Sequence, residues 1–129
     1  MARPSPRVRA RRVYEEPGAD DGARVLIDRL WPRGLSKARA GVDLWLREIA
    51  PSDGLRRWYR HDPELWPEFR RRYRAELAAT PEPLERLTAL ARSGPLTLVF
   101  SSREVRLNNA AVLVELLRSR LRRRAARHG

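Results

Sequence analysis

Two short runs of apolar, mainly β-type residues lie far apart in the chain and limit the folds that are open to it. They cover residues 24–30 and 96–100, and the apolar residues of the long segment between them recur mostly at helical spacing. Two strands joined by such a helical crossover are expected to pair in parallel. The first run is apolar on both sides of its pleat, which is typical of an inner strand. We therefore predict an α/β fold, with a small, mainly parallel sheet flanked by helices in a single three-layer-like domain.

The remaining elements follow from alternation, helical spacing and capping residues. Residues 7–14 alternate in part and carry charges that suit an edge strand. Residues 40–50 are predicted to form an amphipathic helix, because their apolar side chains fall at i, i+3, i+4 and i+7; these are Val42, Trp45, Leu46 and Ile49. Ser52 and Asp62 are each expected to cap a helix, and the regular helix after Asp62 is expected to begin near Pro67.

The positive charge of the chain is concentrated at its two ends. The sequence has 28 basic and 16 acidic residues, a formal net charge of +12. Eleven arginines lie in residues 3–12 and 118–127, so residues 13–117 hold 17 basic and 16 acidic residues. We expect a frayed basic arm at 1–10, an α/β domain at 11–117 and a basic helix end or tail at 118–129. These Arg-rich termini either bind nucleic acid or are simply solvated, and the near absence of lysine is also typical of a GC-rich genome.

Composition excludes several classes of protein and site. The chain has no cysteine, which rules out disulfides and thiolate metal sites. No apolar run approaches the roughly 20 residues of a membrane span, and the N-terminus lacks the apolar middle of a signal peptide. We expect a cytoplasmic protein that does not contact a membrane. His61 and His128 do not form a closed ligand set, and no dinucleotide or Walker motif is present, so neither a metal nor a cofactor is predicted.

Polar side chains follow both predicted strands, where parallel sheets bind their ligands. The expected anion-binding residues are Arg29, Trp31, Arg33 and Lys37 after the first strand, and Ser101, Ser102, Asn108 and Asn109 after the second. Arginines hold phosphates or carboxylates through paired hydrogen bonds, and the start of a helix also favours an anion. The predicted ligand is an anionic small molecule or a nucleotide. Asp28 and His61 are the candidate catalytic residues, as acid or base.

Each of these residues also has a purely structural interpretation. Asp28 alternatively pairs with an arginine or caps the loop, and Trp31 alternatively covers the core. Ser101 or Ser102 suits an N-cap, the two asparagines suit a surface, and Asp62 behind His61 suits a cap better than a catalytic dyad.

The loop after the first strand also resembles a known signature. Residues 24–37, Arg-Val-Leu-Ile-Asp-Arg-Leu-Trp-Pro-Arg-Gly-Leu-Ser-Lys, closely resemble that of the YeaO-like proteins in the domain-of-unknown-function 488 (DUF488) family. The resemblance covers roughly residues 11–117 and continues through Asp43–Leu46, Ile49–Ser52, Leu55–Tyr59, His61–Pro63, Trp66, Phe69, Tyr73, Glu76–Leu77, Asn108–Ala110 and Val112–Leu113. It implies a small α/β domain and brings no established reaction or ligand. Residues 101–107 depart from the alanine- and acid-rich stretch that is usual in the family, and both Arg-rich ends lie outside its pattern.

Three hypotheses remain open at this point. The first is a protein that binds an anion or nucleotide in a polar cleft, with hydrolase or transferase chemistry as an extension. The second is a nucleic-acid-associated module that uses the Arg-rich ends. The third is a structural or partner-binding protein, for which exposed aromatic helix faces would be the expected sign.

Overall fold

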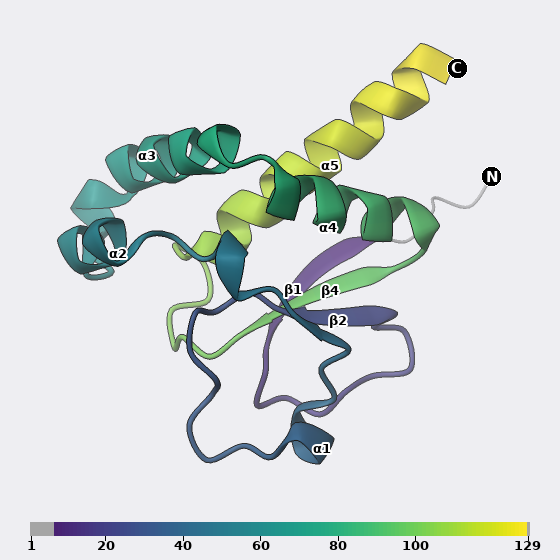
Figure 1. Ribbon diagram of the computed structural model, residues 1–129, viewed down its shortest axis with the longest axis horizontal. Helices are drawn as coiled ribbons and strands as arrows, with labels where there is room; N and C mark the ends of the chain where they lie inside the picture. Colours follow the sequence, from purple (N-terminus) through teal and green to yellow (C-terminus); the bar gives the residue numbers. More distant parts are fainter. Residues whose placement is uncertain (1–6, 129) are drawn as a thin grey trace.

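The fold is an α/β domain with a small parallel sheet, as predicted. The computed structural model describes residues 7–128, with side chains described as far as Arg123. The sheet contains β1 (Val8–Arg12), β2 (Ala23–Leu26), β3 (Leu44–Trp45) and β4 (Leu96–Phe100), in the order β1-β4-β2-β3. All three neighbouring pairs are parallel (Figure 1). The strands β2 and β4 are therefore parallel, as the length and helical spacing of the segment between them indicated.

The two runs that framed the prediction lie side by side in the middle of the sheet. β4 has the predicted bounds, and all five of its residues are buried between β1 and β2. β2 pairs with it so that Val25 lies opposite Leu98, and it ends at Leu26, earlier than the predicted residue 30. Just after the strand, the Ile27 amide still donates to the Val99 carbonyl oxygen, and the Asp28 carboxylate then contacts Ser101 at the end of β4. Gly22, just before β2, has a φ of 64°, and a Cβ there would lie 2.1 Å from the Pro95 carbonyl oxygen, so only glycine fits.

One face of the sheet is covered by a layer of helices, which stand above the sheet in Figure 1. They are α2 (Asp53–Tyr59), α3 (Trp66–Ala79), α4 (Glu82–Ser93) and α5 (Asn109–His128). The main core lies between this layer and the sheet, and its members include Ile27, Leu87, Leu98, Leu113 and Leu117, all fully buried. Burial of such side chains stabilises a fold by roughly 1.5–3 kcal/mol each, so the core under the helices supplies most of the hydrophobic stabilisation of the domain.

The opposite face has a much thinner cover. Its core consists of Val13, Leu26, Ala40 and Val99, with Trp31, Leu35, Val42 and Trp45 packed against them. The only helix there among the described residues is the single turn α1 (Lys37–Ala40), which lies below the sheet in Figure 1. Arg24 supports this turn by donating to the carbonyl oxygens of Ala40 and Gly41 at 3.0 and 3.1 Å. The third layer is thus mostly the loop that contains the signature.

The predicted helix at 40–50 is wrong. This segment contains the two-residue strand β3 and a 3-10 turn, η1 (Arg47–Ile49). Val42 and Trp45 pack in the small core, whereas Leu46 and Ile49 pack in the main core on the other face of the sheet. The i, i+3, i+4, i+7 spacing arises because the chain crosses the edge of the sheet and supplies both cores in turn.

The predicted caps are confirmed. Ser52 Oγ accepts a hydrogen bond from the Leu55 amide at the start of α2. Asp62 accepts from the Glu64 amide at the start of a second 3-10 turn, η2 (Pro63–Leu65), and α3 then begins with Trp66 and Pro67. Proline fits there because the first amides of a helix have no carbonyl partner within it.

The basic ends belong partly to the folded body. Residues 8–10 of the arm expected at 1–10 form the first part of β1, and residues 1–6 lie outside the described residues. Residues 118–128 continue α5 without a break. Within residues 7–128, none of the helices combines the length and apolar composition that crossing a membrane requires.

Candidate functional site

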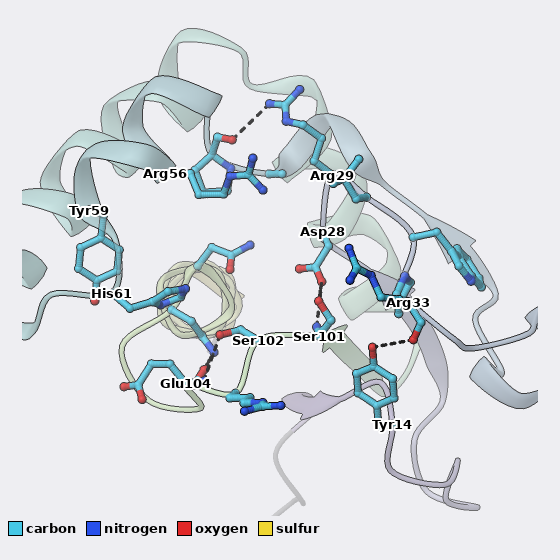
Figure 2. Close-up of a pocket in the computed structure, with 18 of the residues that line it drawn as sticks. Tyr14, Asp28, Arg29, Arg33, Arg56, Tyr59, His61, Ser101, Ser102 and Glu104 are labelled. Carbon is cyan, nitrogen blue, oxygen red and sulfur yellow. Dashed lines mark hydrogen bonds between the residues drawn. The ribbon is translucent and has the colours of Figure 1, made fainter.

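A cavity of about 720 Å³ opens at the carboxyl edge of the sheet (Figure 2). It collects residues from the ends of β1, β2 and β4, from the loops that follow them, and from α2 and α3. The lining residues are Tyr14, Asp28, Arg29, Leu30, Trp31, Pro32, Arg33, Ala50, Pro51, Arg56, Tyr59, His61, Phe69, Ser101, Ser102, Arg103, Glu104, Asn108 and Asn109. The two polar groups that follow the predicted strands therefore share one cavity, as parallel neighbouring strands require.

Asp28 lies in the wall of this cavity and is held by the end of β4. Its Oδ2 accepts from the Ser101 amide and from Ser101 Oγ, each at 2.8 Å. Burial raises the pKa of Asp28, and this effect outweighs the two Ser101 donors and the positive charge of Arg56, which act in the opposite direction. Asp28 is a half-buried carboxyl group with both Ser101 hydrogen bonds on one of its oxygens, and its protonated form is more favoured than that of an ordinary aspartate.

Four guanidinium groups and two carboxyl groups line the cavity. Arg29 is anchored, because it donates to the Pro51 carbonyl oxygen at 3.2 Å and lies 3.3 Å from Asp53. Arg56 lies 3.4 Å from the same Asp53 oxygen. Arg33 and Arg103 are exposed and form no ion pair with any acid in the described part of the chain. These two are the guanidinium groups best able to take an anion.

Aromatic rings form the wall opposite Asp28. Tyr59 stacks on Phe69 with ring centroids 4.2 Å apart, and the exposed ring of His61 lies 5.7 Å from Tyr59 (Figure 2). Tyr59 also donates to the Leu107 carbonyl oxygen at 2.7 Å. Burial, helped by Glu104 and Asp62, raises the pKa of Tyr59 to about 12, so its hydroxyl stays protonated. The wall therefore presents an apolar surface, and the hydrogen bond from Tyr59 to Leu107 connects it to the loop that precedes α5.

His61 owes its position to an uncommon backbone. Arg60 and His61 have φ angles of 49° and 56°, in the left-handed region that residues with a Cβ seldom adopt. Arg60 ends α2 in this conformation, and His61 then points along the cavity wall. Asp62 caps η2, so the imagined His61–Asp62 dyad is not formed. Strained residues of this kind often gather at functional sites.

The loop from Ser101 to Asn108 is organised by its own hydrogen bonds. Ser102 Oγ accepts from the Glu104 amide, and Glu104 in turn accepts from the Leu107 amide. Asn108 is buried, donates to the Glu104 carbonyl oxygen and accepts from the Ala111 amide, so it caps α5. The structural interpretation therefore accounts for much of Ser102 and Asn108, whereas Asn109 stands beside the cavity at the first turn of α5.

Two of the predicted residues have other positions or roles. Lys37 is exposed in α1 and does not line the cavity. Trp31 does line it, but its Nε1 donates to the Leu35 carbonyl oxygen at 2.6 Å and its ring packs edge-on against Trp45. Trp31 thus covers the small core while its other side faces the cavity.

Sequence reasoning missed several lining residues. Tyr14, Arg56, Tyr59, Phe69 and Glu104 were not among the candidates. Arg103 follows Ser102 in the polar group after the second predicted strand but was not assigned a binding role, and the same strand-end rule extends to Glu104. Tyr59 and Phe69 belong to the main core and also line the cavity.

A metal site finds no support in the described residues. Within residues 7–128, no group of three or more His, Asp or Glu side chains is placed to hold an ion. The chemistry that the cavity offers is anion binding by guanidinium groups, hydrogen bonding by Asp28 and Asn109, and apolar contact with Tyr59 and Phe69.

Comparison with known proteins gives one family. The family model described as "Inactive DUF488-N3 subclade" matches residues 7–129. The chain is 45% identical over 114 residues to an uncharacterised protein of Mycobacterium tuberculosis strain H37Rv, covering 88% of this chain and 96% of that protein. It is 40% identical over 112 residues to the uncharacterised protein YeaO of Escherichia coli K12, covering 87% of this chain and 97% of YeaO. No solved structure matches the chain.

Proposed function

The chain belongs to the DUF488 family and resembles YeaO, and we propose that its carboxyl-edge cavity binds a small anionic molecule, with a nucleotide as the best fit. One observation carries this proposal. Arg33 and Arg103 face the cavity without an acidic partner among residues 7–128, beside a wall of aromatic rings. Guanidinium groups left without a carboxylate are suited to a phosphate, which they bind through two parallel hydrogen bonds.

The distribution of charge favours a ligand with two different ends. Arg33, Arg56 and Arg103 attract an anionic group of the ligand. Asp28 repels it when the Asp28 carboxyl group is ionised. The part of the ligand next to Asp28 is therefore neutral and rich in hydrogen-bond donors, such as a sugar hydroxyl or a base amino group. The exposed imidazole of His61, which lies against the buried ring of Tyr59, suits a flat ring. A nucleoside phosphate has all three properties.

Binding is favoured over catalysis. The family to which the chain belongs is described as an inactive subclade, which supports a binding role without turnover. His61 has no Asp62 partner to orient it, because Asp62 accepts from the Glu64 amide. Hydrolase or transferase chemistry, with Asp28 or His61 as the base, is the second candidate, and the raised pKa of Asp28 is the observation in its favour.

The first test is calorimetry with AMP, adenosine and inorganic phosphate. We expect AMP to bind most tightly, because it alone engages both the arginines and the aromatic wall. The Arg33→Gln/Arg103→Gln variant should weaken AMP binding by roughly 10- to 100-fold, the range for hydrogen bonds to charged groups. Arg39→Gln/Arg86→Gln is the matched control, since both arginines are exposed and lie outside the cavity.

The outcomes separate the hypotheses. Equal affinity in the two double variants, or no binding of AMP by the wild type, would contradict the proposal. Analysis of the recovered nucleotide decides about turnover. Cleavage that is lost in Asp28→Asn would make the protein a hydrolase instead of a binding protein.

The described helices lack the exposed aromatic faces that a partner-binding protein was expected to have. The exposed large apolar side chains among the described residues are Tyr14, Leu30 and Val105, and none of them lies on a helix. The aromatic side chains of α2 and α3 pack against the main core. We therefore rank partner binding below the anion-binding and nucleic-acid-binding hypotheses.

A further inference from the structure

The two arginine-rich ends of the chain come together on one edge of the molecule. α5 packs along β1, and Arg118 donates to the Val8 carbonyl oxygen from Nε at 3.2 Å and from Nη2 at 2.8 Å. A shallow hollow of about 410 Å³ lies between them and is lined by Ala10, Ala111, Val114, Glu115, Arg118 and Arg122. We define the basic edge as this hollow together with Arg7, which precedes β1 and donates to the Arg92 carbonyl oxygen at the end of α4.

We infer that the basic edge is a binding surface for the sugar-phosphate backbone of duplex nucleic acid. It is independent of the cavity. The cavity opens at the carboxyl ends of the strands. The arginine-rich half of α5 runs away from that end, and Figure 1 shows it projecting past α4 on the side where β1 begins. The sequence suggested two separate tails, whereas among the described residues Arg7 and Val8 lie beside Arg118 and Arg122 of α5 on one edge of the molecule.

The acids near this surface leave most of its positive charge uncompensated. Glu115 lies in the hollow, but it is paired with Arg70 and lies 4.0 Å from Arg74 on α3. Arg9 and Arg11 point to the other face of β1, where Asp21 and Glu15 pair with them, so they do not belong to this surface. Arg118 and Arg122 are exposed, and as i and i+4 neighbours they point to the same side of α5. A repeating polyanion complements this row of fixed charges.

The same surface lacks what other polyanionic partners need. A membrane interface requires apolar or aromatic side chains that enter the acyl region. Single-stranded nucleic acid requires aromatic platforms on which bases stack. Among the described residues, the exposed large apolar side chains are Tyr14, Leu30 and Val105, and these lie at the cavity or in the loop before α5. A duplex backbone needs only positive charge and hydrogen-bond donors.

The test removes one arginine from each end of the full-length chain. Arg7→Gln/Arg122→Gln leaves the Arg118 contact with Val8 intact, so the fold should be retained, which circular dichroism checks. Binding to a short duplex DNA of mixed sequence is followed by fluorescence anisotropy over a series of salt concentrations. We expect affinity to fall by about tenfold and the salt slope to fall by about 2, because each substituted arginine leaves one phosphate without its counter-charge.

Two control variants lose two positive charges, as the test variant does. Arg39→Gln/Arg86→Gln and the cavity variant Arg33→Gln/Arg103→Gln should each change duplex affinity by less than about twofold, because neither pair lies on the basic edge. Equal losses in all three variants would overturn the inference, as would binding that does not depend on salt. Tighter binding to phosphatidylserine vesicles or to single-stranded DNA than to the duplex would also overturn it.

Discussion

The two ends of β2 each carry an aspartate beside arginines, and the two arrangements differ in how far their hydrogen bonds are satisfied. Asp21, before the strand, is only 2% exposed and accepts from the Gly18 amide and from three guanidinium groups, those of Arg24, Arg11 and Arg9. The carboxylate of Asp28, after the strand, accepts only from Ser101 among the described residues. Figure 2 shows it directed into the cavity.

The pKa values of the two carboxyl groups differ in the same way. Burial would raise the pKa of Asp21, but the Gly18 amide and the arginines outweigh burial and the pKa is lowered. At Asp28 burial prevails and the pKa is raised. The same pair of residue types therefore stabilises the fold where its hydrogen bonds are saturated and remains available to a ligand where they are not.

The largest effect is expected at the saturated end. Asp21→Asn leaves the buried Arg24 without its charged partner, and the free energy of unfolding should fall by about 3–5 kcal/mol. Because the folded-state pKa of Asp21 is lowered, its contribution is present above the ordinary value of 3.8 and is lost as pH falls through the folded-state value. Urea unfolding at neutral and acid pH measures both, and the variant should differ less from the wild type in acid.

The control is the double variant Asp21→Asn/Arg24→Met, which removes the stranded charge and should regain part of the loss. A loss of stability at Asp28→Asn as large as that at Asp21→Asn would remove the distinction between the two ends.

A smaller effect is expected at the cavity end. Ser101→Ala removes one of the two hydrogen bonds to Asp28 and should cost about 1 kcal/mol. It should also raise the pKa of Asp28 further, because the missing donor favours the carboxylate. Since that pKa lies above 3.8, the stability contributed by Asp28 is complete below 3.8 and is lost as pH rises through the folded-state value. Carboxyl NMR titration gives the pKa directly. The Ser102 hydroxyl accepts from the Glu104 amide and does not contact Asp28, so Ser102→Ala should leave the pKa of Asp28 unchanged.

The smallest effect concerns the strained backbone beside the cavity. Arg60→Gly should stabilise the protein by at most about 1 kcal/mol, because glycine adopts the left-handed conformation that ends α2 without steric cost, while its flexible unfolded chain offsets part of the gain. Thermal unfolding measures the change. Arg57→Gly, within α2, should instead destabilise by roughly 1 kcal/mol. Destabilisation at both positions would mean that Arg60 carries no strain.

Several features followed from local rules. The bounds of β4, the inner position of β2, the caps at Ser52 and Asp62, and the edge strand β1 were predicted from periodicity and turn chemistry. Most of the residues predicted for the site also line the cavity, because the position of ligands at the carboxyl ends of parallel strands is a property of the topology.

The failures have a common cause. The predicted helix at 40–50 was wrong because Trp45 and Leu46 pack in two different cores, and a one-dimensional pattern does not distinguish one helix face from two sheet faces. Tyr59 and Phe69 were not recognised as lining residues, because a side chain that borders both a core and a cavity has the same spacing as one that is entirely internal.

The sequence by itself determined that this chain forms an inner strand, a helical crossover and a parallel partner, because backbone propensity and apolar periodicity act over a few residues. The tertiary structure decided which charges are satisfied. Whether an aspartate accepts from four residues or from one depends on residues distant in the chain, as when Ser101 contacts Asp28. The difference between a structural ion pair and a site is made by these long-range contacts, since only they set the burial and the hydrogen-bond partners of each charge.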